Sequence, residues 1–212
     1  MKETEKRCYS GQEFRTIENE QNEKYIEGHA AVFEQKVDIC DCFFEVIDRN
    51  AFSEESLRDV ALFVNHECNQ IPLARSRQND GKSTMTLSID DIGLAIKAKL
   101  DTENNPTARA LYSSVARGDI AGMSFSFRVE DEEWQNLDSD MPTRRIKKIS
   151  RVYEVSAVSY PAYEGTDISA RAHSTLENAR KSLDKAKAQK SKDDKANEIE
   201  ILRLKNKILG GI

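Results

Sequence analysis

Apolar and polar residues alternate along most of the chain between residues 24 and 159, and β-branched and aromatic residues are frequent in the alternating stretches. A period of two puts successive side chains on opposite faces of a β-strand. The pattern predicts strands at residues 25–33, 43–47, 60–65, 83–89, 94–100, 123–129, 145–150 and 152–159. Many strands at short spacing favour a β-barrel or a β-sandwich.

Two segments interrupt the strand pattern. Residues 53–57 predict a short helix, and residues 106–117 predict a longer one with signals at both ends. Asn105 suits the N-cap, and Pro106 suits the first helical position because the N–H that it lacks has no helical partner there. Gly118 ends this helix.

The chain changes character after residue 165. Ala, Lys, Glu, Asp and Asn dominate, with no Gly or Pro before Gly210, which favours one long helix or two shorter ones. Residues 1–22 are polar and show little periodicity. The sequence therefore predicts a weakly ordered lead-in over residues 1–23, a folded domain over residues 24–170 and a charged helical tail over residues 171–212.

Composition limits the number of domains. At 212 residues and 38% hydrophobic, the chain can build one substantial core with an appendage. Residues 171–212 carry 11 Lys and Arg against 6 Asp and Glu, whereas the preceding part carries 21 against 31. An acidic body thus precedes a basic tail. A solvated charged helix is the ordinary interpretation of such a tail; an acidic partner is the alternative, and nucleic acid is not expected.

Membrane and disulfide signals are absent from the sequence. No stretch approaches the roughly 18 apolar residues of a membrane span, and the first residues lack the apolar core of a signal peptide. We therefore expect a protein that stays in the cytosol where it is made, without a membrane partner. Its four cysteines, Cys8, Cys40, Cys42 and Cys68, are expected to be free thiols.

Residue types suited to acyl transfer occur in three of the predicted strands or at their ends. His66 closes an apolar strand, and imidazole is the base best suited to neutral pH. Ser124 and Ser126 share one face of a strand whose other face carries phenylalanines, so the serines are expected to face a polar cleft. A serine nucleophile needs a base, and the base needs a third group to hold its tautomer, for which Glu154 is the candidate. A plain strand with a solvated polar face is the alternative.

Five motifs in order extend this pattern over about residues 24–170. They are Gly28-His-Ala-Ala-Val-Phe, Asp48-Arg-Asn-Ala-Phe52, Val64-Asn-His-Glu67, Gly122-Met-Ser-Phe-Ser-Phe127 and Glu154-Val-Ser-Ala-Val-Ser-Tyr-Pro-Ala162. With these motifs the chain resembles the phage prohead protease family, the tailed-phage relatives of the herpesvirus capsid assembly protease. Each motif alone is weak, and the ordered set is specific.

The resemblance implies an α+β fold, mainly an antiparallel β-barrel with surrounding helices. It implies a serine endopeptidase with nucleophile Ser124, base His66 and third member Glu154, with Glu67 as the other acidic candidate. No cofactor is implied. The implied substrates are the scaffold segment of the major capsid protein and the protease itself, inside the immature capsid in the host cytoplasm. A homo-oligomer is compatible with the family.

Two alternatives remain open at this stage. Cys40, Cys42, His66 and Cys68 together offer a donor set that tetrahedral zinc accepts, although their spacing is unusual for zinc. The chain could also be a non-catalytic capsid assembly or scaffold protein of the same fold, because a fold does not fix a function.

Overall fold

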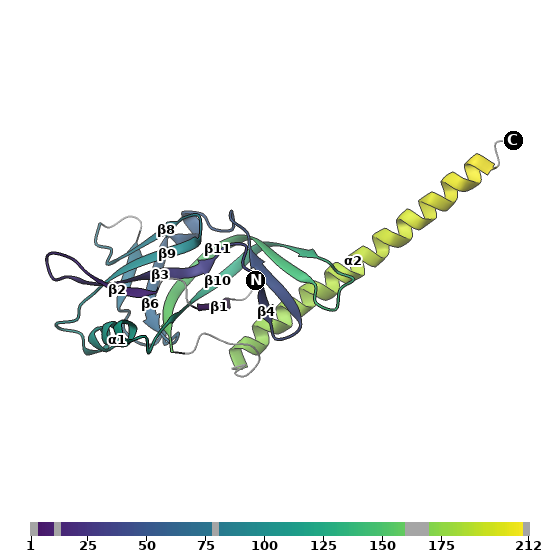
Figure 1. Ribbon diagram of the computed structural model, residues 1–212. Helices are drawn as coiled ribbons and strands as arrows, with labels where there is room; N and C mark the ends of the chain where they lie inside the picture. Colours follow the sequence, from purple (N-terminus) through teal and green to yellow (C-terminus); the bar gives the residue numbers. More distant parts are fainter. Residues whose placement is uncertain (1–3, 11–13, 78–80, 160–169, 210–212) are drawn as a thin grey trace.

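The computed structural model of the chain describes residues 4–10, 14–77, 81–159 and 170–209, which form two β-sheets and a long helix that extends away from them (Figure 1). The strands are β1 (Glu5–Ser10), β2 (Arg15–Glu18), β3 (Lys24–Val32), β4 (Val37–Ile39), β5 (Phe43–Ile47), β6 (Asp59–Val64), β7 (Ala74–Arg77), β8 (Met85–Ile89), β9 (Gly93–Leu100), β10 (Gly122–Gln135) and β11 (Thr143–Val158). The helices are α1 (Pro106–Arg117) and α2 (Ala170–Leu209), with one 3₁₀ turn at Glu55–Leu57.

The larger sheet is mixed. It has seven strands in the order β1-β10-β11-β5-β4, and β6 pairs with β11 and β7. Strand β11 pairs antiparallel with β10 but parallel with β5 and β6. The smaller sheet has four antiparallel strands in the order β2-β3-β9-β8.

The predicted β-barrel is wrong, although the α+β class is right. In the described part of the chain the two sheets remain separate and neither closes on itself. Alternating side chains look the same in a barrel and in two packed sheets, so the sequence pattern could not distinguish them. The predicted ring of helices is also absent from the described residues, where α1 is the one α-helix besides α2.

A single large core lies between the two sheets. Phe125 and Phe127 of β10 are fully buried in it and stack with ring centroids 4.4 Å apart. Ile26 and Leu94 of the smaller sheet belong to the same core. Burial of such side chains contributes about 1.5–3 kcal/mol each, which fixes the face of β10 that points inward. The opposite face, with Ser124, is thereby fixed as well.

Helix α1 follows the sequence prediction closely. The Asn105 side chain accepts hydrogen bonds from the N–H groups of Thr107 and Ala108, at 3.0 and 3.2 Å. Gly118 ends the helix in the left-handed conformation, with φ 78°. Both caps satisfy backbone groups that the helix leaves unpaired.

The first residues differ from the predicted weakly ordered lead-in, because β1 and β2 lie there and both pair with other strands. The polar side chains of Glu5 and Arg7 in β1 form ion pairs with distant residues, which a local pattern does not reveal. Strand β11 is also one strand where the pattern predicted two. The part of the predicted domain at residues 160–169 lies outside the described residues.

The tail forms one helix, α2, as the composition allowed. Ala179 packs on Phe43, and the Trp134 indole N–H donates to the Ser182 hydroxyl at 3.0 Å. Ile199 and Ile208, further along, are exposed. None of the described helices is long and apolar enough to cross a membrane.

Candidate active site

Ser124 lies near the start of β10, in the middle of three paired strands. Its neighbours across the sheet are Cys8 in β1 and Ser156 in β11. The side chain is fully buried, and its hydroxyl donates a hydrogen bond to the backbone carbonyl of Arg7 at 2.8 Å. The face is polar as predicted, but Ser124 is fully buried, so the expected open cleft at Ser124 is not observed.

A tight turn directly after β6 positions His66. Asn65 and His66 have φ of 50° and 60°, and the Glu67 N–H closes the turn on the Val64 carbonyl at 3.0 Å. Positive φ at both central residues is the requirement of a type I′ turn, and Asn and His are among the residues that tolerate it best. The Asn65 carboxamide oxygen accepts the Ser159 N–H at 3.0 Å, which fixes the turn to the end of β11.

The His66 ring and the buried Glu154 carboxylate form a short contact. Nδ1 of His66 lies 2.6 Å from Oε1 of Glu154, whose side chain is 3% exposed. The Ser156 hydroxyl donates to the other carboxylate oxygen at 2.6 Å and accepts the backbone N–H of His66 at 3.2 Å. The carboxylate thus holds Nδ1 as the protonated nitrogen and leaves Nε2 as the basic one.

Two hydrogen bonds set the protonation of His66. Burial of the ring disfavours its charged form, but the hydrogen bonds with Cys8 and Glu154 outweigh the burial and raise the pKa of His66 above its ordinary value. The charge of Lys6 acts in the opposite direction. An imidazole with a raised pKa beside a buried carboxylate is typical of an acid–base site.

The structure therefore joins two of the three predicted residues directly and brings the third close. His66 and Glu154 are in contact, and Ser124 lies opposite Ser156, the residue that bonds both of them. Among the described residues no hydrogen bond joins Ser124 to His66. Glu67 is exposed, while Nδ1 of His66 faces Glu154.

Sequence reasoning missed the contribution of β1 to this site. The Arg7 carbonyl bonds the Ser124 hydroxyl, and the Cys8 side chain bonds the His66 ring. Residues 5–8 read Glu-Lys-Arg-Cys, which carries no alternation of apolar and polar positions. The pairing of β1 with β10 has no local signal in the sequence.

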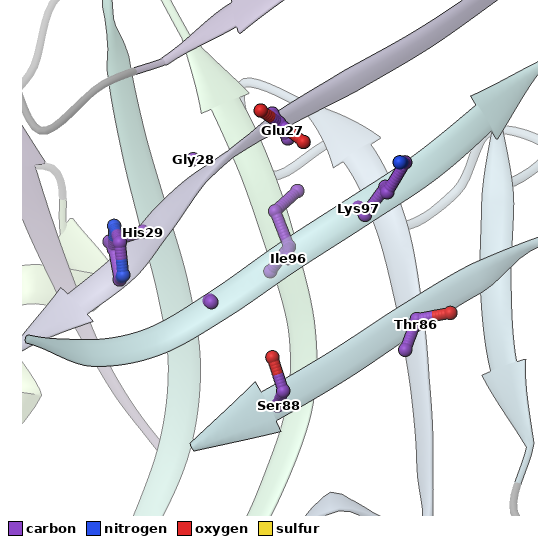
Figure 2. A pocket seen from close by; sticks show the side chains of 8 residues that line it. Glu27, Gly28, His29, Thr86, Ser88, Ile96 and Lys97 are labelled. Atoms are coloured by element: carbon purple, nitrogen blue, oxygen red, sulfur yellow. The ribbon is translucent and has the colours of Figure 1, made fainter. Parts of the chain in front are cut away.

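A second histidine–carboxylate pair lies on the smaller sheet. Nε2 of His29 is 2.9 Å from Oδ2 of Asp90, and His29 borders a pocket of about 340 Å³ with Ser88 and Lys97 (Figure 2). His29, Lys97 and Ser88 come from the three neighbouring strands β3, β9 and β8. Within the described part of the chain, Ser88 makes no hydrogen bond to His29. Among the described residues, the His29–Asp90 pair therefore has no hydrogen-bonded serine hydroxyl that it could activate as a nucleophile.

The zinc alternative finds no support in the geometry. In residues 4–10, 14–77, 81–159 and 170–209, no three His, Cys, Asp or Glu side chains form a group that could hold a metal ion. Cys42 instead accepts a hydrogen bond from Arg180 of α2 at 2.7 Å, and the His66 ring is bonded to Glu154.

Two of three comparisons with known proteins find a match. A family model described as caudovirus prohead serine protease matches residues 12–182. Among solved structures, the capsid assembly protease of bacteriophage T4 is similar with a TM-score of 0.44 and 13% identity, over 75% of this chain and 98% of the T4 chain. The comparison with curated proteins finds no matching sequence.

Proposed function

The chain belongs to the caudovirus prohead serine protease family, and from this premise we propose that Ser124, His66 and Glu154 are its catalytic triad. It is a serine protease of capsid maturation, as the sequence motifs predicted. The observation that carries the residue assignment is the partly buried 2.6 Å contact between His66 and Glu154, next to the strand position of Ser124.

The proposed mechanism is acyl transfer. Nε2 of His66 takes the proton of the Ser124 hydroxyl as the oxygen attacks a peptide carbonyl carbon of the substrate. Glu154 keeps its bond to Nδ1 and stabilises the imidazolium that forms. His66 then gives the proton to the leaving amine, and water releases the acyl group from Ser124 in a second, equivalent step.

Family membership makes capsid protein the substrate class. We further propose that the cleaved part is the scaffold segment of the major capsid protein, and that the protease also cleaves itself. Both reactions would take place inside the immature capsid, in the host cytoplasm. Assembly into a homo-oligomer there is compatible with this role. The predicted division of the chain at about residue 170 remains part of the proposal, with α2 as a tail that follows the protease domain.

Active-site labelling tests the residue assignment. A fluorophosphonate reacts with a serine that an adjacent base activates, so the purified chain is expected to gain one covalent adduct, which peptide mass spectrometry locates at Ser124. Ser124→Ala and His66→Ala are expected to abolish the adduct, whereas Ser126→Ala keeps it. An adduct on another serine would contradict the assignment, and the absence of any adduct both in the full chain and in a chain lacking residues 2–10 would favour the non-catalytic assembly protein.

A further inference from the structure

Strand β1 occupies an edge that a protease would need to leave open. It is the outermost strand next to β10 and pairs with it antiparallel, with Cys8 opposite Ser124 and Lys6 opposite Ser126. An extended peptide that adds to a sheet edge makes the same backbone pairing, with alternate side chains in pockets. The position of β1 is thus the position that an extended substrate segment would take beside the nucleophile.

Both reactive groups of the proposed triad have partners in β1. The Ser124 hydroxyl directs its proton to the Arg7 carbonyl, at 2.8 Å, and the His66 ring bonds Cys8. A reactive serine must instead direct that proton to the imidazole. Ser124 is also fully buried, so another chain cannot reach its hydroxyl in the described arrangement.

Charged groups hold β1 on the opposite face. Glu5 accepts two hydrogen bonds from Arg144, at 2.7 and 2.8 Å, and Arg7 donates to Glu45 at 2.7 Å. All four side chains are at most 10% exposed. Ion pairs this buried depend on matched geometry, so the site selects for an acidic residue and a basic residue two positions later.

The buried Arg144 has ion-pair partners besides β1. Without Glu5 and Arg7, Arg144 still has Glu45 and Glu132 as ion-pair partners. The family model matches residues 12–182, so β1 also lies outside the matched part of the chain. Both facts are consistent with an edge strand that can leave while Arg144 keeps ion-pair partners.

We propose that the edge of β10 from Gly122 to Phe127 is the binding groove for an extended segment of the substrate protein, and that β1 is a built-in mimic of that segment. The segment carries an acidic residue that reaches Arg144 and a basic residue two positions later that reaches Glu45. Strand β1 must leave before Ser124 acts on another chain. This inference rests on the proposed assignment of Ser124 as nucleophile.

The rate of fluorophosphonate labelling at Ser124 tests the inference. A variant lacking residues 2–10 is expected to react at least about tenfold faster than the full chain, because reactivity scales with the fraction of molecules that have an open site. A synthetic peptide of residues 4–10 is expected to slow the truncated variant again. The same peptide with Arg7→Glu is expected to have no effect, because it places a carboxylate against Glu45.

A pair of full-length variants covers the case in which the truncated chain does not fold. The Arg7 carbonyl faces β10, and the N–H of the same residue points the same way. Arg7→Pro removes that N–H and disfavours strand pairing, whereas Arg7→Ala removes the same charge and keeps the N–H. The proline variant is expected to label faster than the alanine variant. Equal labelling rates in this pair of variants, or in the full and truncated chains, would overturn the inference about β1. Labelling at Ser124 would in that case still support the triad. Absence of labelling in every form would instead overturn the triad and the inference with it.

Discussion

Replacement of Glu154 by Gln isolates the charge of the proposed third member. The amide has nearly the same size and shape as the carboxylate, so its oxygen can still accept the Nδ1–H of His66 and its NH₂ group can face the Ser156 hydroxyl. The orientation of the ring is therefore kept. What is lost is the negative charge opposite the imidazolium that forms when His66 takes the proton of Ser124.

The size of the effect follows from the geometry. Nδ1 and Oε1 lie 2.6 Å apart, and both charges are spread over their groups. With charge centres about 4 Å apart and an effective dielectric constant of about 20, the attraction is about 4 kcal/mol. Since a factor of ten in rate corresponds to about 1.4 kcal/mol, Glu154→Gln is expected to lower kcat/KM about 10³-fold.

The assay is the kcat/KM for cleavage of a capsid-derived fluorogenic peptide by the purified chain, with Glu67→Gln as the matched control. Glu67 follows His66 directly in the chain but is exposed. The same loss of charge there is expected to change the rate by about twofold or less. Activity of Glu154→Gln within about tenfold of the unmodified chain would refute the reasoning. A large loss in Glu67→Gln instead would assign the third role to Glu67.

Four further predictions concern the surroundings of the site and the fold. Ser156→Ala leaves a buried oxygen of Glu154 without its donor and is expected to lower the free energy of unfolding by about 1–3 kcal/mol, measured by chemical denaturation; an unchanged value would contradict the role of this hydroxyl. The base must be neutral and the pKa of His66 is raised, so kcat/KM is expected to rise with pH through a value above about 6.5. Cys8→Ala removes one of the hydrogen bonds that raise this pKa and should move the rise to lower pH, whereas an unmoved profile would count against the contact. Asn105→Ala removes the N-cap of α1 and is expected to cost about 1 kcal/mol in thermal or chemical unfolding, while no loss would show that the cap is dispensable.

The sequence predicted those parts of the fold that depend on local pattern. Asn105 and Gly118 mark the ends of α1 because caps and left-handed glycines act within one turn. The alternation around Ser124 predicted which face of β10 packs in the core, since Phe125 and Phe127 are the large apolar residues there. The family resemblance of the motifs is confirmed by the family match.

The remaining features depend on pairing between distant residues. Glu5 and Arg7 are polar in sequence, and they are buried because Arg144 of β11 and Glu45 of β5 form ion pairs with them. No pattern in the first ten residues of the sequence indicates these ion pairs. The same holds for the separation into two sheets, because strand order is set by tertiary pairing and not by the period of a strand.

The most direct test of the central claim is co-expression of the chain with the capsid protein of its phage, followed by intact-mass analysis of that protein. We expect the unmodified chain and Ser126→Ala to shorten the capsid protein. Loss of Ser124 or His66 costs on the order of 10⁶ in rate in a serine triad, so Ser124→Ala and His66→Ala are expected to leave the capsid protein at full length. Processing that persists in Ser124→Ala would contradict the assignment of the nucleophile.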